Sequence, residues 1–292
     1  MSIIERALEK QRNTGQEAPP VGQRPPSLRP AAAEAAGQPA RRTPSESLHL
    51  DLDALCAAGV LPAEEFSERL TEQFRRVKWP LLESALGRGA TAAAASAVMI
   101  TSAIPGEGKT FVCFNLALSI AREKDLDVLV VDADVAKRHL TQLLGADSRP
   151  GLIDAAADAH LDPEQLVLGT GIEGLSFLPS GQRTSVASEL FASRRMAEVV
   201  EALRRADPQR MVLFDCSPLL ATNETQVLAS LVDQVVLVVC AESTSQPVVL
   251  EALNLLDRGK QIRCLLNRAP ITHLHEYYDY GYGYPHEQPR QP

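Results

Sequence analysis

The stretch "SAVMITSAIPGEGKTFVCFNLALSIAREK", residues 96–124, decides the fold. It begins with an apolar run typical of a buried strand, passes through a glycine-rich loop and ends in an apolar helical pattern. In this order of elements, backbone N–H groups of the loop and the N-terminus of the helix point at phosphate oxygens. The stretch therefore predicts a nucleotide-phosphate site at the end of the strand.

The loop also carries the side chains that such a site uses. Lys109 can reach the β- and γ-phosphates of a nucleotide, and the Thr110 hydroxyl can bind Mg²⁺. The full pattern G-x-x-x-x-G-K-[ST] asks for glycine at position 103, where this chain has alanine. We expect the nucleotide to be bound by the loop residues Pro105, Gly106, Glu107, Gly108, Lys109, Thr110 and Phe111.

The rest of the chain repeats the alternation of strand and helix. Helical patterns, such as those over 110–124 and 188–206, separate apolar, β-branched runs at 96–103, 127–133, 175–180, 210–216, 234–241 and 262–267. Continuous apolar strands that alternate with helices are typical of a parallel sheet covered on both faces. The predicted fold class is a three-layer α/β fold of the P-loop NTPase type, with a mainly parallel sheet.

Polar side chains end several of these strands. Asp132 and Asp134 end the second predicted strand, and Asp215 ends the fourth. Open parallel sheets bind ligands at the carboxyl ends of their strands, so these carboxylates should meet Lys109 at one edge. Carboxylates beside phosphates imply a bridging Mg²⁺, and hence NTP hydrolysis or phosphoryl transfer. Asn267 closes the last strand, where its amide could read a purine or simply make a turn.

Composition limits the function further. The net charge of −8 and the pI near 5.4 argue against a nucleic-acid-binding protein. The five cysteines show no metal-ligand spacing, so reduced, buried thiols are expected. No apolar run approaches the roughly 18–20 residues needed to span a bilayer. We expect a cytoplasmic protein that another protein recruits to the inner membrane.

The chain divides into three parts. Residues 1–61 are expected to be a short N-terminal helix and a disordered Pro/Ala-rich linker, and residues 62–269 the P-loop domain. The first helix of that domain should be kinked or interrupted at Pro80. Residues 270–292 are expected to be a flexible tail, and this tail holds all five tyrosines of the chain, Tyr277, Tyr278, Tyr280, Tyr282 and Tyr284.

Three classes of protein fit these observations: a partitioning-type ATPase, a GTP switch and a kinase. The segment "LNRAP" lacks the aspartate of the N-K-x-D motif that GTP switches use to read the base. Ile104 stands where partitioning ATPases carry an extra lysine. Both observations weaken the first two classes.

The motifs together resemble those of the bacterial tyrosine autokinases, the BY-kinases that accompany exopolysaccharide export. The similarity is closest to the branch associated with exosortase (XrtA) systems. It lies in "MSIIERALEK", "LDLDALCAAGVL", "LTEQFRRVKWPLL" and residues 96–268. The hallmarks are "SAIPGEGKT" as Walker A, "VDADVAKR" as Walker A′ and "FDCSPLL" as Walker B.

This resemblance implies an Mg·ATP-dependent protein tyrosine kinase of the P-loop domain, residues 62–269. Thr110 would bind Mg²⁺, helped through water by Asp134 and Asp215, and Asn267 would lie near the adenine. Asp132 would accept or orient the proton of the tyrosine hydroxyl. The implied catalytic residues are Lys109, Asp132, Asp134 and Asp215.

The resemblance also implies partners. The chain would phosphorylate its tail tyrosines in trans within a ring-like homo-oligomer and so regulate exopolysaccharide polymerisation and export. The family joins protomers through an E-x-x-R-x-x-R helix motif, which here reads Glu72, Arg75 and Lys78. A membrane chain-length determinant, or polysaccharide co-polymerase, would be the activator, and a tyrosine phosphatase would reverse the modification. An assembly-switch ATPase of the partitioning type, without kinase activity, is the alternative.

Overall fold

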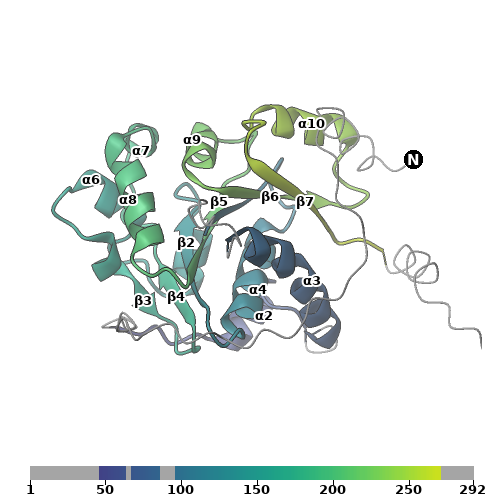
Figure 1. The fold of residues 1–292 in the computed structure, drawn as a ribbon, viewed down its shortest axis with the longest axis horizontal. Helices are drawn as coiled ribbons and strands as arrows, with labels where there is room; N and C mark the ends of the chain where they lie inside the picture. The colour runs from purple at the N-terminus through teal and green to yellow at the C-terminus, as the bar shows by residue number, and fades with distance from the viewer. Residues whose placement is uncertain (1–45, 64–66, 86–95, 271–292) are drawn as a thin grey trace, which may run out of the picture. The chain divides into compact units, whose positions relative to one another are not determined.

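The computed structural model describes residues 46–63, 67–85 and 96–270. Within these ranges seven strands form one sheet in the order β3-β4-β2-β5-β1-β6-β7 (Figure 1). Among these strands, β3 pairs with β4 in the antiparallel direction, and every other neighbouring pair is parallel. The strands are β1 (Ala97–Ser102), β2 (Asp127–Ala133), β3 (Leu168–Gly169), β4 (Leu175–Leu178), β5 (Arg210–Cys216), β6 (Gln234–Cys240) and β7 (Gln261–Asn267).

The central strands are buried on both faces. Along β1, Val98 and Ile100 belong to one hydrophobic layer, and Ala97 and Met99 belong to the other. Side chains of a strand alternate between its two faces, so a strand covered on both sides must be apolar throughout. This requirement explains the uninterrupted apolar runs of the sequence, and it confirms the predicted parallel α/β class. All six predicted strands are present, and β3 is the one that has no sequence signal.

Helices cover both faces and complete three layers (Figure 1). The first layer contains α2 (Leu52–Ala57), α3 (Ser67–Ala85), α4 (Lys109–Ala121) and α5 (His139–Leu143). The second layer contains α6 (Leu152–Ala157), α7 (Ala187–Phe191), α8 (Arg194–Arg205), α9 (Asn223–Leu231) and α10 (Gln246–Asn254), with the short 3₁₀ helix η2 (Pro163–Leu166) beside it.

The packed domain begins before the expected boundary at residue 62. Leu48 N–H donates to the Gly169 carbonyl at 2.7 Å, which ties the entering chain to β3. Leu55 of α2 is fully buried in the first layer. Asn115 of α4 donates to the Val60 carbonyl at 2.7 Å. Residues 46–61 are therefore part of the domain, although the remaining expectations for residues 1–45 lie outside the described ranges.

The helix α3 was expected to be kinked or interrupted at Pro80. It runs through Pro80 to residue 85, so proline does not interrupt it. The helical pattern over 188–206 is split into α7 and α8, because the Ser193 hydroxyl accepts the Met196 N–H at 3.2 Å and caps a new helix. Local capping thus overrides a continuous periodicity.

All five cysteines lie in the described ranges, and none of them forms a disulfide bond. Three are buried as expected, whereas Cys56 and Cys264 are exposed, so the expectation of buried thiols was wrong for these two. Among the helices of the described residues, none has the length and apolarity required to cross a membrane.

Candidate functional site

The loop between β1 and α4 has the backbone geometry of a phosphate cradle. Gly106 and Gly108 have φ angles of 89° and 90°, a backbone conformation that residues other than glycine rarely adopt. A Cβ atom on Gly108 would lie 2.2 Å from the side-chain amide nitrogen of Asn267, so that side chain would have to move. Ala103 is buried and has no positive φ, which explains why alanine can replace the glycine of the full pattern.

Glu107 fixes this loop from the inside. Its side chain is 2% exposed and accepts the N–H of Ile104 at 2.8 Å and the N–H of Cys240 at 3.2 Å. The Thr244 hydroxyl donates to the same carboxylate. The expectation that Glu107 binds the nucleotide therefore holds at most for its backbone, because its side chain ties the loop to the segment between β6 and α10.

Lys109 lies among carboxylates at the sheet edge. Its ammonium group is 3.1 Å from Oδ2 of Asp134, and Ser217 donates to Oδ1 of the same aspartate at 2.6 Å. Burial lowers the pKa of Lys109, but Asp215 and Asp134 outweigh it and raise the value. For Asp134, burial raises the pKa, and the Lys109 charge reverses the effect, so the pKa is lowered. The two groups therefore form a charged pair.

Asp132 and Asp215 lie side by side, since they are paired in register on β2 and β5. Asp132 is fully buried, and its Oδ2 accepts both the N–H and the hydroxyl of Thr141, at 2.8 and 2.7 Å. Its Oδ1 accepts the Asp134 N–H at 3.2 Å. Desolvation raises the pKa of Asp132 to about 6, in spite of the Thr141 bonds.

Asp215 is the least satisfied of the three carboxylates. It is 1% exposed, and its Oδ1 has no hydrogen-bond partner in the described part of the chain. Burial raises its pKa to about 7, while the nearby Lys109 and a hydrogen bond from Thr110 oppose the shift. A buried carboxylate oxygen without a partner is costly, and such an atom indicates a site for an absent ligand, ion or water.

These residues fit Mg²⁺. The donor set is all oxygen, from the Thr110 hydroxyl and from Asp134 and Asp215, and the orphaned oxygen of Asp215 supplies a free position. Mg²⁺ keeps several waters and is held by one or two carboxylates together with phosphates, and Asp134 and Asp215 are two such carboxylates.

Asn267 and Phe111 are engaged within the chain. The Asn267 amide donates to the Glu107 carbonyl at 2.8 Å, and its oxygen accepts the Arg268 N–H at 2.9 Å. The Phe111 ring lies against Phe74 of α3, with centroids 6.0 Å apart. The side chain of Phe111 therefore joins α4 to α3, and only its backbone belongs to the phosphate loop. Pro105 and Gly106 form the exposed tip of that loop.

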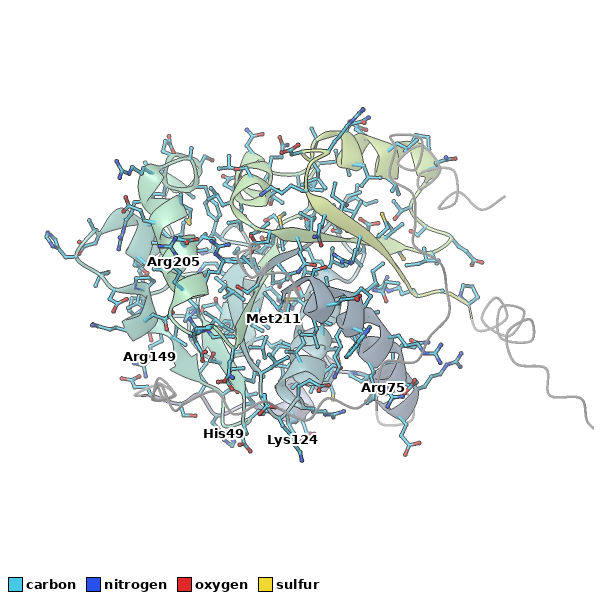
Figure 2. The ribbon with its side chains drawn as sticks, viewed as in Figure 1. His49, Arg75, Lys124, Arg149, Arg205 and Met211 are labelled. Atoms are coloured by element: carbon cyan, nitrogen blue, oxygen red, sulfur yellow. The ribbon has the colours of Figure 1, made fainter. Side chains whose placement is uncertain are left out.

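The three residues of the oligomer motif are in different situations. Arg75 is exposed and pairs with Glu72 at 2.8 Å, and Figure 2 shows it on the outer side of α3. Lys78 is 5% exposed and points inward, where its ammonium group donates to the Ser119 carbonyl at 2.7 Å and pairs with Glu123 at 2.6 Å. The expectation that Lys78 contacts another protomer is thus contradicted, because its charge is used to attach α3 to α4. The five tail tyrosines lie outside the described residues.

Sequence reasoning missed two residues that hold the carboxylates. Ser217 could have been noticed, since it follows Asp215 by two positions in "DCSP". Thr141 had no signal, because it reaches Asp132 only through the turn between β2 and α5. Thr141 also contacts Ser180 at the end of β4, with 3.2 Å between the hydroxyl oxygens.

Known proteins resemble this chain in sequence and in fold. No protein-family model matches the chain. The tyrosine-protein kinase YwqD of Bacillus subtilis is 30% identical over 214 residues, which cover 72% of this chain and 86% of YwqD. The chain belongs to the bacterial tyrosine kinases.

The kinase domain of VpsO is similar in structure, with 29% identity and a TM-score of 0.58 over 71% of this chain and all of that one. The kinase domain of the Escherichia coli tyrosine kinase ETK gives 25% identity and a TM-score of 0.57, over 73% and 80% of the two chains.

Other relatives of this tyrosine kinase family are much longer. EpsB of Ralstonia nicotianae is 35% identical over 190 residues, or 64% of this chain but 24% of EpsB. The tyrosine-protein kinase wzc of Salmonella typhimurium is 30% identical over 187 residues, which make up 25% of its length. The chain therefore spans about a quarter of these relatives.

Proposed function

We propose that the chain is an ATP-dependent protein tyrosine kinase that phosphorylates its own tail. One observation carries this proposal: a phosphate loop with Lys109 meets three buried aspartates, in a chain whose only tyrosines form a cluster beside Glu276 and Asp279. Membership in the bacterial tyrosine kinase family supports the same reaction. The narrower assignment to the exosortase-associated branch stays a prediction.

The proposed reaction transfers the γ-phosphoryl group of ATP to a phenol. The tyrosine oxygen forms the new bond to phosphorus, the bond to the bridging oxygen of ADP breaks, and the phenolic proton leaves. A phenol has a pKa near 10, so a carboxylate must take or hold this proton. Asp132 is the proposed acceptor, because its pKa of about 6 is nearer to neutrality than that of an ordinary aspartate, and its Oδ1 accepts a single N–H.

The remaining site residues are proposed to bind and orient ATP. The backbone N–H groups of residues 106–111 would hold the phosphates, Pro105 would shape the start of the loop, and Asn267 would lie near the adenine. Lys109 would exchange its ion pair with Asp134 for the β- and γ-phosphates. Mg²⁺, when bound by Thr110, Asp134 and Asp215, would offset the charge of the phosphates. Most of the rate would then come from position and charge, as is usual in phosphoryl transfer.

Phosphorylation is proposed to occur between chains of a homo-oligomer. Arg75 and Glu72 on the exposed face of α3 are the proposed contact between protomers. Each phosphate would add nearly two negative charges to the tail and would loosen a ring-like assembly held by tail insertion. A tyrosine phosphatase would restore the assembly.

A role in exopolysaccharide polymerisation and export is proposed from the relatives. One of them, ExoP of Rhizobium meliloti, is named a succinoglycan biosynthesis transport protein, and it is 28% identical over 63% of this chain. We propose a membrane polysaccharide co-polymerase as activator and recruiting partner of a cytoplasmic kinase.

The test measures phosphotyrosine and ATP hydrolysis on the same sample with Mg²⁺ and ATP. Wild type should gain phosphotyrosine, and Lys109→Ala should gain none. The measurement is repeated with the cytoplasmic segments of a polysaccharide co-polymerase present. ATP hydrolysis without phosphotyrosine in both conditions would contradict the kinase function and favour a partitioning-type ATPase.

A further inference from the structure

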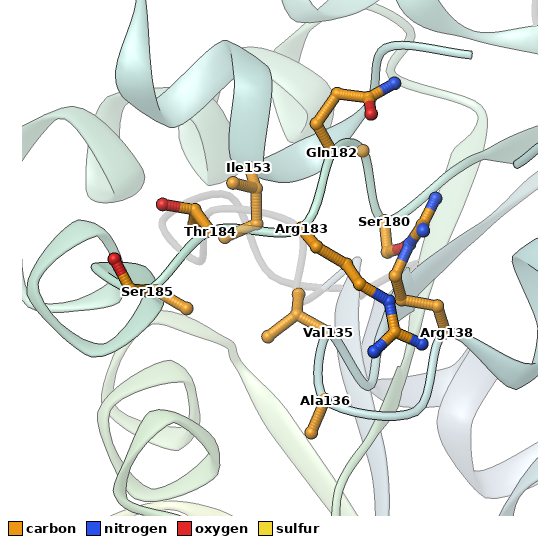
Figure 3. A pocket seen from close by; sticks show the side chains of 11 residues that line it. Val135, Ala136, Arg138, Ile153, Ser180, Gln182, Arg183, Thr184 and Ser185 are labelled. Carbon is orange, nitrogen blue, oxygen red and sulfur yellow. The ribbon is translucent and has the colours of Figure 1, made fainter. Parts of the chain in front are cut away.

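A pocket lies beside the carboxylates and plays no part in binding ATP as proposed above. It has a volume of about 340 Å³, within the roughly 300–1,000 Å³ that is usual for ligand pockets. One wall is the loop that follows Asp134, with Val135, Ala136 and Arg138. The opposite wall is the segment 180–185 after β4, and Figure 3 shows the two walls facing each other.

Hydrogen bonds join this pocket to the proposed proton acceptor. Ser180 on the pocket wall contacts the Thr141 hydroxyl at 3.2 Å, and that hydroxyl donates to Asp132 at 2.7 Å. The pocket wall is therefore two hydrogen bonds from Asp132. A peptide held in the pocket would lie next to the position where a tyrosine oxygen must meet the γ-phosphate.

The pocket carries an uncompensated positive charge. Arg138 is buried, and its guanidinium donates to the Ser180 hydroxyl at 3.1 Å and to the Asp147 backbone carbonyl at 3.0 Å. These bonds hold Arg138 in the pocket wall. Arg183 is exposed and has no ion pair or hydrogen bond from its side chain with any described residue. Figure 3 shows the Arg183 side chain extending across the pocket toward Val135 and Ala136.

The other lining groups match this charge. Gln182, Thr184 and Ser185 add an amide and two hydroxyls, and no lining residue is acidic. Asp154 is near this wall, where its Oδ2 accepts the N–H groups of Gly151 and Gln182, and it forms no ion pair with Arg183. The pocket thus offers one free guanidinium and several hydrogen-bond donors to an acidic, polar ligand.

We infer that this pocket binds the acidic residues that flank the acceptor tyrosines of a second copy of the chain, with Arg183 selecting them. The inference rests on the proposed kinase function. The occupant is the segment 275–280, "HEYYDY", in which Glu276 and Asp279 surround three tyrosines. Arg183 is a specificity-determining residue in this account, because its guanidinium can pair with either carboxylate while a neighbouring tyrosine lies near Asp132.

The test separates binding from catalysis. In the donor chain all five tyrosines are replaced by phenylalanine, and the acceptor chain is Lys109→Ala, so label can appear only on the acceptor tail. Charge reversal in the donor, Arg183→Glu, should raise the KM for the acceptor about five- to tenfold and leave kcat and ATP affinity unchanged. Fluorescence anisotropy of a labelled peptide of residues 275–284 on the same full-length donor should show a similar rise in Kd.

Two variants sharpen the result. Arg258→Glu reverses another exposed arginine, beyond α10 and far from the pocket, and should leave the acceptor KM unchanged. An acceptor with Glu276→Lys and Asp279→Lys should be a poor substrate for the original donor and a better one for the Arg183→Glu donor. An unchanged KM and peptide Kd for Arg183→Glu would overturn the inference. A donor with Arg183 intact that binds the peptide but labels no acceptor would instead refute the kinase function.

Discussion

At the scale of single residues, the site is built from charges that the fold does not fully compensate. Asp134 has Lys109 and Ser217 as partners, whereas one buried oxygen of Asp215 has no hydrogen-bond partner among the described residues. Such a group reduces the stability of the free protein and becomes useful only when a ligand reaches it. We therefore expect opposite effects on stability and on binding when this carboxylate is removed.

Asp215→Asn tests this expectation through pH. The pKa of Asp215 in the folded protein, about 7, lies above the ordinary 3.8, so between these values the folded state holds a proton that the unfolded state has lost. The contribution of Asp215 to the free energy of unfolding therefore falls as pH rises from about 4 to 7. Asparagine cannot lose a proton, so the free energy of unfolding of the variant should not show this fall. Measured without Mg²⁺, the difference in free energy of unfolding between the variant and wild type should grow in favour of the variant by about 1 kcal/mol or more from pH 5 to pH 8.

Urea unfolding at both pH values measures this difference, and ATP binding with Mg²⁺ should be lost in the same variant. Asp233→Asn is the control, since Asp233 accepts the Ala97 N–H at 2.9 Å and pairs with Arg204. That variant should lose stability at both pH values. A gain for Asp215→Asn that did not grow with pH would contradict the account.

Glu107→Gln tests the internal support of the phosphate loop. The carboxylate accepts from three donors, and an amide would place an NH₂ group against the N–H of Ile104 or of Cys240. We expect the Kd for ATP to rise about tenfold, equivalent to about 1.4 kcal/mol. Isothermal titration calorimetry measures it, with Thr244→Val as the matched control that removes one donor and keeps both N–H bonds. Equal affinities for Glu107→Gln and wild type would count against this role.

At the scale of elements, α3 has two faces with different tasks. Its inner face is held to α4 by Lys78, whose ammonium group is buried against Ser119 and Glu123. Its outer face presents Arg75 and, one turn later, Trp79, which is 67% exposed. Residues four apart lie on the same face of a helix, so Arg75 and Trp79 would enter a protomer contact together.

We therefore predict that Lys78→Ala reduces the stability of the fold, whereas Arg75→Ala leaves it nearly unchanged. Lys78→Ala should lower the free energy of unfolding by about 1.5–3 kcal/mol, because buried hydrogen bonds of a charged group are lost. Arg75→Ala should change it by less than about 0.5 kcal/mol, since its ion pair is exposed. Chemical denaturation followed by circular dichroism measures both values.

The oligomeric state separates the two faces further. In sedimentation velocity, Arg75→Ala should contain more monomer than wild type. When wild-type chains assemble, the fluorescence emission of Trp79, the only tryptophan of the sequence, should move to shorter wavelength. Assembly that leaves the emission unchanged would show that protomers meet elsewhere.

At the scale of the whole molecule, the sequence predicted what depends on local pattern and on strand order. Strand runs, the glycine loop and the aspartates at strand ends were enough to bring Lys109, Asp132, Asp134 and Asp215 together, since carboxyl ends of parallel strands share one edge. Partners from distant segments were not predictable. The contact of Thr141 with Asp132 depends on how the turn after β2 packs, and periodicity does not carry that information. The inward direction of Lys78 could have been predicted, because it lies four residues after the buried Phe74 on the same face of α3, but its partners Ser119 and Glu123 could not.

The beginning of the domain could have been predicted more closely. The segment 46–61 follows a proline-rich region and was grouped with it, although ten of its sixteen residues are apolar. It is packed, because Leu55 fills a space in the first helical layer and the backbone at Leu48 pairs with β3. A truncation that begins at residue 62 would therefore remove part of the core.

The central claim is that the buried carboxylate edge and the tyrosine tail are enzyme and substrate within one kind of chain. Mass spectrometry tests it most directly. Wild type and Lys109→Ala are each incubated with Mg²⁺ and ATP, digested and mapped for phosphotyrosine. Wild type should carry phosphate on residues between Tyr277 and Tyr284, and mixing the two chains should place phosphate on the tail of Lys109→Ala as well. An unmodified wild-type tail under conditions in which the protein binds and hydrolyses ATP would contradict the account.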